Sequence, residues 1–223
     1  MTGPSSAKGG ASRGVLVLVA VLALAAGSWL GLSLLGNGRG PTPPLDEVRA
    51  ATLLPLPKPL SPADLTDQDG EPFRLDRLAG RWTFLSFGYT SCPDVCPMTM
   101  ATFVALRREL SQKGKDPHTA FLFVSVDPER DTPQRIAQYV RWFDPSFLGA
   151  TGDHRELQAL TGQLGVLYAR SEQRDSALGY LVDHTASILL LDPKGRLSAI
   201  FSAPHNVTAM AADFETIQSY FRN

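Results

Sequence analysis

The chain has 223 residues, of which 43% are hydrophobic, and its formal net charge is −1. This length can hold one ordinary domain and an additional segment. The near-neutral charge argues against a nucleic-acid-binding surface. The sequence contains no internal repeat and no glycine-rich phosphate loop, so nothing in it supports nucleotide binding.

The N-terminal part of the chain has the pattern of a membrane anchor. Residues 1–14 are small and polar, lack acidic side chains, and place Lys8 and Arg13 just before an apolar stretch. Residues 15–35 carry no charge, and about 21 residues at roughly 1.5 Å each match the ~30 Å core of a bilayer. The positive-inside rule predicts a cytoplasmic tail over 1–14 and a single transmembrane helix over 15–35. The rule then puts everything after Leu35 outside the cytoplasm, and the expected location of the folded domain is the periplasmic side of a bacterial inner membrane.

A cleaved signal peptide is the rival interpretation, because Ala23-Leu24-Ala25 resembles a cleavage site. The apolar run continues past Ala25 to Leu35, which favours an uncleaved anchor. No cysteine lies near this segment, which excludes a lipoprotein anchor. Gly27 and Gly31 form a G-x-x-x-G pair that can pack helices, although this is a weak signal among so many small residues.

Residues 36–62 are rich in proline and glycine and predict a semi-rigid spacer after the anchor. The alternative is that this stretch is only an irregular edge of the following domain. The folded domain is expected over 63–223, a size that supports a single core.

Hydrophobic periodicity predicts that strands and helices alternate in this domain. Residues 63–75 indicate an N-terminal hairpin around Asp69-Gly70, and Thr132 and Asp153 are expected to cap two helices. The order strand, helix, strand, helix, hairpin, helix is typical of a thioredoxin-like α/β fold. The expected strands are 82–87, 120–126, 166–170, 187–191 and 197–201; one helix follows the cysteines and the others span 132–142, 153–164 and 207–221.

Cys92 and Cys96 are the only two cysteines of the chain and are expected where a strand meets a helix. Unpaired backbone N–H groups and the helix dipole favour the thiolate there and lower a cysteine pKa. Either Pro93 or Pro97 can take the first helical position, so the helix can begin at either residue. Both sulfurs are therefore expected to be reactive or able to bind a metal.

The spacing of the cysteines favours a metal site over a disulfide. The two residues are four positions apart, so a helical turn would place both side chains on one face. Their Cβ atoms would then be about 5–6 Å apart, whereas a disulfide requires roughly 3.5–4.5 Å. A structural disulfide or a pair of buried thiols remains the alternative, but structural disulfides usually close longer loops.

His184 is the histidine expected to face the cysteines. In a thioredoxin-like arrangement, the residues just before Ser187 lie at the same sheet edge as the cysteine turn. By contrast, His118, His154 and His205 are most simply solvent-exposed.

Two thiolates and one imidazole form a soft donor set that suits copper(I) and can also hold copper(II). A Cys₂His set with an open position describes catalytic zinc as well. Met98 and Met100 can add thioether ligands, although core packing is the more usual role of methionine.

Four segments of the chain then carry a resemblance. They are LAGRW (78–82), FGYTSCPDVCP (87–97), SVDPERDT (125–132) and VDHT (182–185). Together they resemble the Sco/SenC family, whose members are assembly factors for cytochrome c oxidase. The resemblance covers the folded domain and its anchor, and it implies a thioredoxin-like fold with Cys92, Cys96 and His184 as copper ligands. His184 lies where ordinary thioredoxins place a cis-proline.

The resemblance also matches the family's D-x-x-x-D pattern to Asp127 and Asp131, whose role it leaves open. Alternatively, Asp127 and Thr132 only end one element and cap the next. The implied function is that of a copper metallochaperone, not an enzyme, with three partners: the copper A-bearing oxidase subunit, an upstream copper donor and a thiol reductant. The alternatives are a thiol-disulfide oxidoreductase with Cys92 and Cys96 as its redox-active pair, and a peroxidase.

Overall fold

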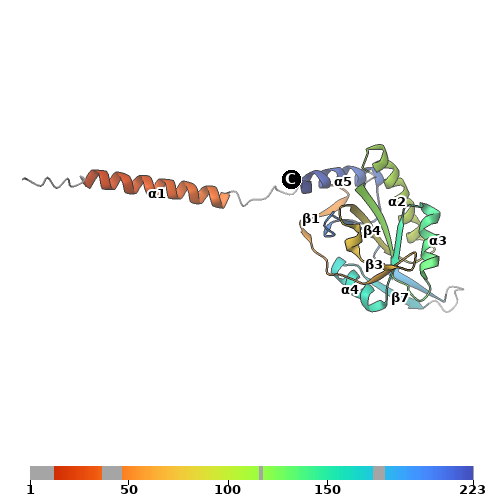
Figure 1. The fold of residues 1–223 in the computed structure, drawn as a ribbon. Coiled ribbons are helices and arrows are strands. Elements are labelled where there is room, and N and C mark those ends of the chain that lie inside the picture. Colours follow the sequence, from red (N-terminus) through yellow and green to blue (C-terminus); the bar gives the residue numbers. More distant parts are fainter. Residues whose placement is uncertain (1–12, 37–46, 116–117, 173–178, 223) are drawn as a thin grey trace, which may run out of the picture. The chain divides into compact units, whose positions relative to one another are not determined.

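The computed structural model describes residues 13–36, 47–115, 118–172 and 179–222. The chain divides into two units, Met1–Thr42 and Pro43–Asn223, and each is considered by itself (Figure 1). The expected tail lies outside the described residues except for its last two positions, and so do residues 37–46 of the expected spacer.

In its described part, the first unit consists of helix α1 (Arg13–Gly36). The window Gly14–Gly31 has a mean hydropathy of 2.2, and none of it is buried. At about 1.5 Å per residue, 24 residues are long enough to cross the ~30 Å core of a bilayer. Among the described residues, α1 is the one helix long and apolar enough to do so.

An eight-stranded mixed sheet forms the centre of the second unit, in the order β1-β10-β9-β4-β5-β6-β2-β3. Strands β4 (Trp82–Gly88) and β5 (Thr119–Ser125) pair in parallel, and all their residues are buried because helices cover both faces of the sheet. Strands β7 and β8 form a separate two-stranded antiparallel sheet. The remaining strands are β1 (Ala51–Lys58), β2 (Leu65–Asp67), β3 (Pro72–Phe73), β6 (Leu148–Thr151), β7 (Tyr168–Glu172), β8 (Tyr180–His184), β9 (Ile188–Leu191) and β10 (Leu197–Phe201).

Two hydrophobic layers form because successive strand residues point to opposite faces of the sheet. Phe84 and its neighbours on one face pack under α2 (Val95–Gln112), α3 (Pro133–Phe143) and α5 (Val207–Arg222). Leu85 and its neighbours on the other face pack against α4 (His154–Leu164) and the 3₁₀ helix η1 (Leu75–Leu78). Figure 1 shows α2 and α3 side by side and α4 away from them. The predicted thioredoxin-like α/β fold is confirmed.

Local signals in the sequence are also confirmed. The side chain of Thr132 accepts a hydrogen bond from the Arg135 amide at the start of α3, and that of Asp153 accepts one from the Glu156 amide at the start of α4. The predicted hairpin around Asp69-Gly70 is the antiparallel pair β2–β3.

The prediction of a spacer through residue 62 is wrong for 51–58, which form β1 and pair with β10. The start of β1 and the two residues before it are also fixed, because the Asp213 carboxylate accepts hydrogen bonds from the amides of residues 49–51. Pro55 and Pro57 are tolerated in β1 because it is an edge strand, where a missing N–H need not break a ladder. Strands β6 and β8 were likewise absent from the predicted elements.

Candidate metal centre

The two cysteines follow the carboxyl end of β4, as expected. Both side chains are buried, with Cys92 8% exposed and Cys96 2% exposed. Helix α2 begins at Val95 after the N-cap Asp94, so neither Pro93 nor Pro97 takes its first position and that expectation is wrong. Cys92 therefore lies in the turn before the helix, whereas Cys96 lies in its first turn.

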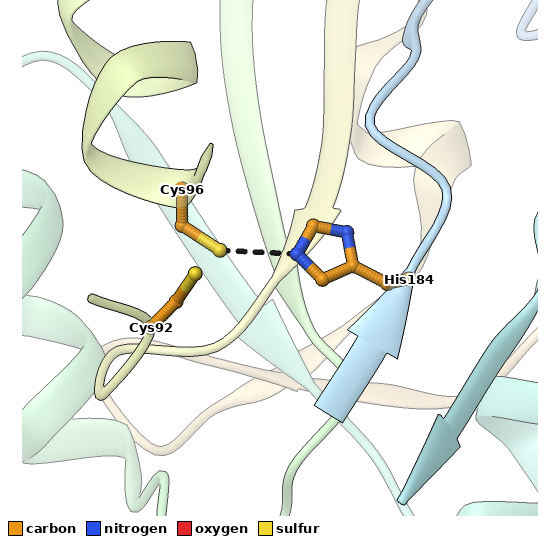
Figure 2. A group of neighbouring side chains, drawn as sticks. All are labelled: Cys92, Cys96 and His184. Carbon is orange, nitrogen blue, oxygen red and sulfur yellow. Dashed lines mark hydrogen bonds between the residues drawn. The ribbon is translucent and has the colours of Figure 1, made fainter. Parts of the chain in front are cut away.

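His184 is the last residue of β8, opposite Tyr168 of β7. Its ring points toward the cysteines, with Nε2 3.1 Å from Cys96 Sγ (Figure 2). The two sulfurs and a ring nitrogen of His184 all lie within 4.8 Å of one another. The sequence-predicted set of Cys92, Cys96 and His184 is thus brought together from three separate elements.

The other ring nitrogen of His184 is held by the backbone. Nδ1 lies 3.2 Å from the Thr185 carbonyl oxygen, which can only accept a hydrogen bond, so Nδ1 carries a proton. Nε2 is therefore the ring nitrogen that would bind a metal ion. Metal-binding histidines are commonly oriented in this way, with the second nitrogen donating to a carbonyl or carboxylate.

The two thiols differ in acidity, which the expectation of two reactive or metal-binding sulfurs does not distinguish. A hydrogen bond from Cys96, together with His184 and nearby backbone amides, outweighs burial and lowers the pKa of Cys92 to about 3. The same hydrogen bond and burial raise the pKa of Cys96 well above its usual value. The hydrogen bond between the sulfurs thus favours the thiolate on Cys92 and the proton on Cys96.

Gly88, at the end of β4, provides the space in which the Cys96 sulfur lies. A Cβ atom at this position would stand 2.7 Å from Cys96 Sγ and 2.8 Å from Cε2 of Phe123. Contacts this short do not occur in real structures, so only glycine fits here without moving its neighbours. No linear pattern marks Gly88 for this role, because the clash with Phe123 involves a residue that is distant along the chain.

The donor set and its geometry fit a soft metal ion. Ligand bonds of about 2.0–2.3 Å put two ligands of one ion at most about 4.6 Å apart, close to the 4.8 Å spread of these atoms. Thiolates select copper(I) or zinc, and imidazole also suits copper(II). Neither Asp127 nor Asp131 belongs to this group of ligand atoms.

The other histidines and the two candidate methionines differ in how far they are exposed. His118 and His154 are exposed, as expected. His205 is half-buried instead, and its Nε2 lies 3.1 Å from the Ala186 carbonyl oxygen. Burial lowers its pKa. Met100 is fully buried in the core, whereas Met98 is 58% exposed and does not pack there.

Comparisons with known proteins agree with this geometry. The sequence model of the SCO1/SenC family matches residues 58–219. The SCO2-like protein RP587 of Rickettsia prowazekii is 36% identical over 135 residues, which are 60% of this chain and 65% of that protein. The chain thus spans slightly less than two thirds of that relative.

Two solved structures share the fold of the second unit. The structure of Arabidopsis thaliana ScoI with copper bound has a TM-score of 0.66 and 32% identity, and the match covers 73% of this chain and 98% of that one. Bradyrhizobium japonicum ScoI with copper bound has a TM-score of 0.62 and 34% identity, with 72% and 98% covered. On the extent of the family match and the agreement of the fold, the chain belongs to the SCO1/SenC family.

Proposed function

We propose that this protein is a membrane-anchored copper metallochaperone that delivers copper to the dinuclear copper A site during cytochrome c oxidase assembly. The observation that carries the proposal is the convergence of Cys92, Cys96 and His184, whose ligand atoms lie within 4.8 Å of one another. Copper is favoured over zinc because ScoI proteins at 32% and 34% identity have been solved with copper bound.

The donor set suits copper as a cargo that is taken up and released. Thiolates of Cys92 and Cys96 would hold copper(I), and the imidazole of His184 would extend the site to copper(II). The sulfurs are buried while His184 is only partly so, which places the imidazole on the solvent side of the site. An acceptor protein would approach from that side.

The proposal assigns a role to each part of the chain. Residues 1–14 would be cytoplasmic, α1 would span the bacterial inner membrane, and the folded unit would work in the periplasm. Its partners would be an upstream copper donor, a thiol reductant and the copper A-bearing oxidase subunit. These assignments rest on the charge pattern around α1 and on the description of the Sco family as cytochrome c oxidase assembly proteins.

Copper binding and disulfide formation should exclude each other, because the metal needs thiolates. We expect the full-length protein in detergent to bind about one copper ion per chain after reduction, as one Cys₂His site allows. After oxidation to a Cys92–Cys96 disulfide, the protein should bind no copper at this site. Metal analysis with thiol counting checks this, and full copper uptake with the disulfide intact would sink the proposal.

A thiol-disulfide oxidoreductase is the second candidate function. It is favoured by the unequal acidity of the two sulfurs, since a thiolate on Cys92 beside a protonated Cys96 is the arrangement of an attacking and a resolving thiol. Such an enzyme would reduce the copper-site cysteines of the oxidase subunit.

His184→Ala separates the two functions. A dithiol reductase acts through its sulfurs, so this variant should still exchange disulfides. A copper carrier would lose a ligand: two thiolates can still bind copper(I), but copper(II) prefers four ligands and should bind much more weakly. Copper(II) affinity, disulfide reduction rate and oxidase copper A content are measured in parallel. If all copper readouts stay normal, His184 is not a ligand and the oxidoreductase function takes precedence.

A further inference from the structure

The turn that follows β5, residues 127–131, contacts both halves of the metal centre. It contains the D-x-x-x-D pair, and both carboxylates are buried, with Asp127 2% and Asp131 1% exposed. The backbone ties the pair together, because the Asp131 amide donates a 2.9 Å hydrogen bond to the Asp127 carbonyl. The two aspartates are thus joined directly through the backbone of the turn.

Asp131 holds the loop that carries the thiols. Its Oδ2 accepts hydrogen bonds from the Thr90 amide at 2.8 Å and from Ser125 Oγ at 2.6 Å, and its Oδ1 accepts one from Thr90 Oγ1 at 2.6 Å. Thr90 lies two residues before Cys92. The carboxylate thus joins the cysteine loop to the end of β5.

Asp127 holds the strand that carries the imidazole. Its Oδ1 accepts a 2.7 Å hydrogen bond from the Tyr180 hydroxyl, and its Oδ2 accepts one from Nε of Arg130. Arg130 in turn donates from Nη1 to the Tyr180 carbonyl at 3.0 Å, and its guanidinium lies 3.6 Å from the Tyr180 ring centroid. Tyr180 is the first residue of β8, and His184 is the last.

Strand β8 needs such a tether because its hydrogen-bond ladder does not fix it to the main sheet. Among the described strands it pairs only with β7, in the separate two-stranded sheet. Arg130 also lies 5.4 Å from the ring centroid of Tyr89, whose ring packs edge-on against the ring of His184. The same turn is therefore linked to the His184 ring in two ways, through strand β8 and through the Tyr89 ring.

We propose that Asp127 and Asp131 are positioning residues for the metal site. Asp131 fixes the position of the loop that leads to Cys92. Asp127, through Arg130 and Tyr180, fixes the position of strand β8, which carries His184. This inference rests on the proposed copper function. It explains why the two acids are separated by one turn, since each holds a different part of the ligand set. It also predicts that disturbing the Asp127 contacts affects the His184 ligand, whereas disturbing the Asp131 contacts affects the thiolate ligands.

Conservative variants test each half. Tyr180→Phe keeps the ring and removes the hydroxyl that bonds Asp127, while Thr90→Val keeps the shape and removes the hydroxyl that bonds Asp131. Asp127→Asn and Asp131→Asn are the stronger versions, and the mild pair remains informative where these do not fold. The matched control is Asp192→Asn, because Asp192 is a buried carboxylate, 3% exposed, that holds the turn between β9 and β10.

The measurements use the full-length protein in detergent with copper(II) and copper(I) as probes. Tyr180→Phe should lower copper(II) affinity about tenfold or more, the usual effect of losing an outer-sphere partner, and weaken the imidazole nitrogen coupling in electron paramagnetic resonance. Thr90→Val should alter the thiolate-to-copper absorption band and retain that nitrogen coupling. Asp192→Asn should lower only the thermal midpoint. If the site variants also change only the thermal midpoint, the positioning role is wrong.

A second set of readouts keeps this test independent of the copper proposal. Wild-type protein that binds no copper would refute the proposed function, and the metal-free protein then decides the inference. Tyr180→Phe should shift the ring nitrogen resonances of His184, and Thr90→Val should change the alkylation rate of Cys92. Wild-type values for both in the metal-free variants would overturn the inference.

Discussion

Gly88 determines where the Cys96 sulfur can lie, because an added Cβ would meet that sulfur at 2.7 Å and the Phe123 ring at 2.8 Å. Gly88→Ala should lower the free energy of unfolding by about 1–3 kcal/mol, as overpacking of a dense core usually does. It should also weaken copper binding, because the displaced sulfur no longer points at His184. Chemical denaturation and copper titration of the same variant check both effects.

A second substitution shows which contact matters. Gly88→Ala combined with Phe123→Leu removes the clash with the ring and leaves the clash with the sulfur, and Phe123→Leu alone is the control. The double variant should be more stable than Gly88→Ala, but it should still bind copper more weakly than the wild-type protein. Restored copper binding in the double variant would show that the ring, not the sulfur, was the constraint.

The sequence predicted which three side chains would meet, but not that the two cysteine thiols would differ in acidity. Spacing and the strand-to-helix transition placed Cys92 and Cys96 together, and the β-hairpin order placed His184 opposite them. The acid–base asymmetry depends on the deeper burial of Cys96, 2% exposed against 8%, and on the hydrogen bond between the sulfurs. Neither quantity is contained in a linear pattern. Whether the three residues bind copper in this chain stays a prediction.

At the scale of elements, Asp213 of α5 fixes the entry of the chain into the folded unit. Its carboxylate accepts hydrogen bonds from the amides of Arg49 at 3.1 Å, Ala50 at 2.6 Å and Ala51 at 2.8 Å, and it is 3% exposed. These amides would lose their partner in Asp213→Ala. We expect the free energy of unfolding to fall by about 2–3 kcal/mol, since hydrogen bonds to a buried charge are among the strong ones.

The control for this prediction lies on the same helix. Glu215 pairs with Lys113 at 2.9 Å, but both side chains are more than a third exposed, and such surface pairs contribute only about 0–1 kcal/mol. Glu215→Ala should therefore change stability little. Copper stoichiometry should be normal in both variants, because α5 contributes no ligand. Equal stability losses in the two variants would contradict the proposed role of Asp213.

Elements were predictable where periodicity and capping agreed, as for α3 behind Thr132 and α4 behind Asp153. Strand β1 was missed because Pro55 and Pro57 indicate a spacer, and only its position at the sheet edge makes them acceptable. Strand β8 was missed because it pairs with β7 in a two-stranded sheet that stands apart from the main sheet, which a linear pattern does not indicate. For β1, the deciding contact is with β10, which is remote in sequence.

At the scale of the whole molecule, the proposed function assigns membrane anchoring to helix α1 and copper binding to the folded unit. Helix α1 exposes apolar side chains all along the window Gly14–Gly31, a surface that water does not favour and a bilayer does. Anchoring would confine the copper site to a layer next to the membrane, where an oxidase subunit is assembled. The direction in which α1 crosses decides whether the site faces that compartment.

We expect α1 to cross with its N-terminus in the cytoplasm, because Lys8 and Arg13 precede it and no acidic residue offsets them. Alkaline phosphatase fused after Asn223 should be active, since it folds outside the cytoplasm, and a green fluorescent reporter that folds only inside should be dark. The opposite pattern would reverse the topology. The mass of the mature protein tests the anchor separately: a chain that begins near Ala26 would have lost the first half of α1 to a signal peptidase, leaving the copper-binding unit untethered.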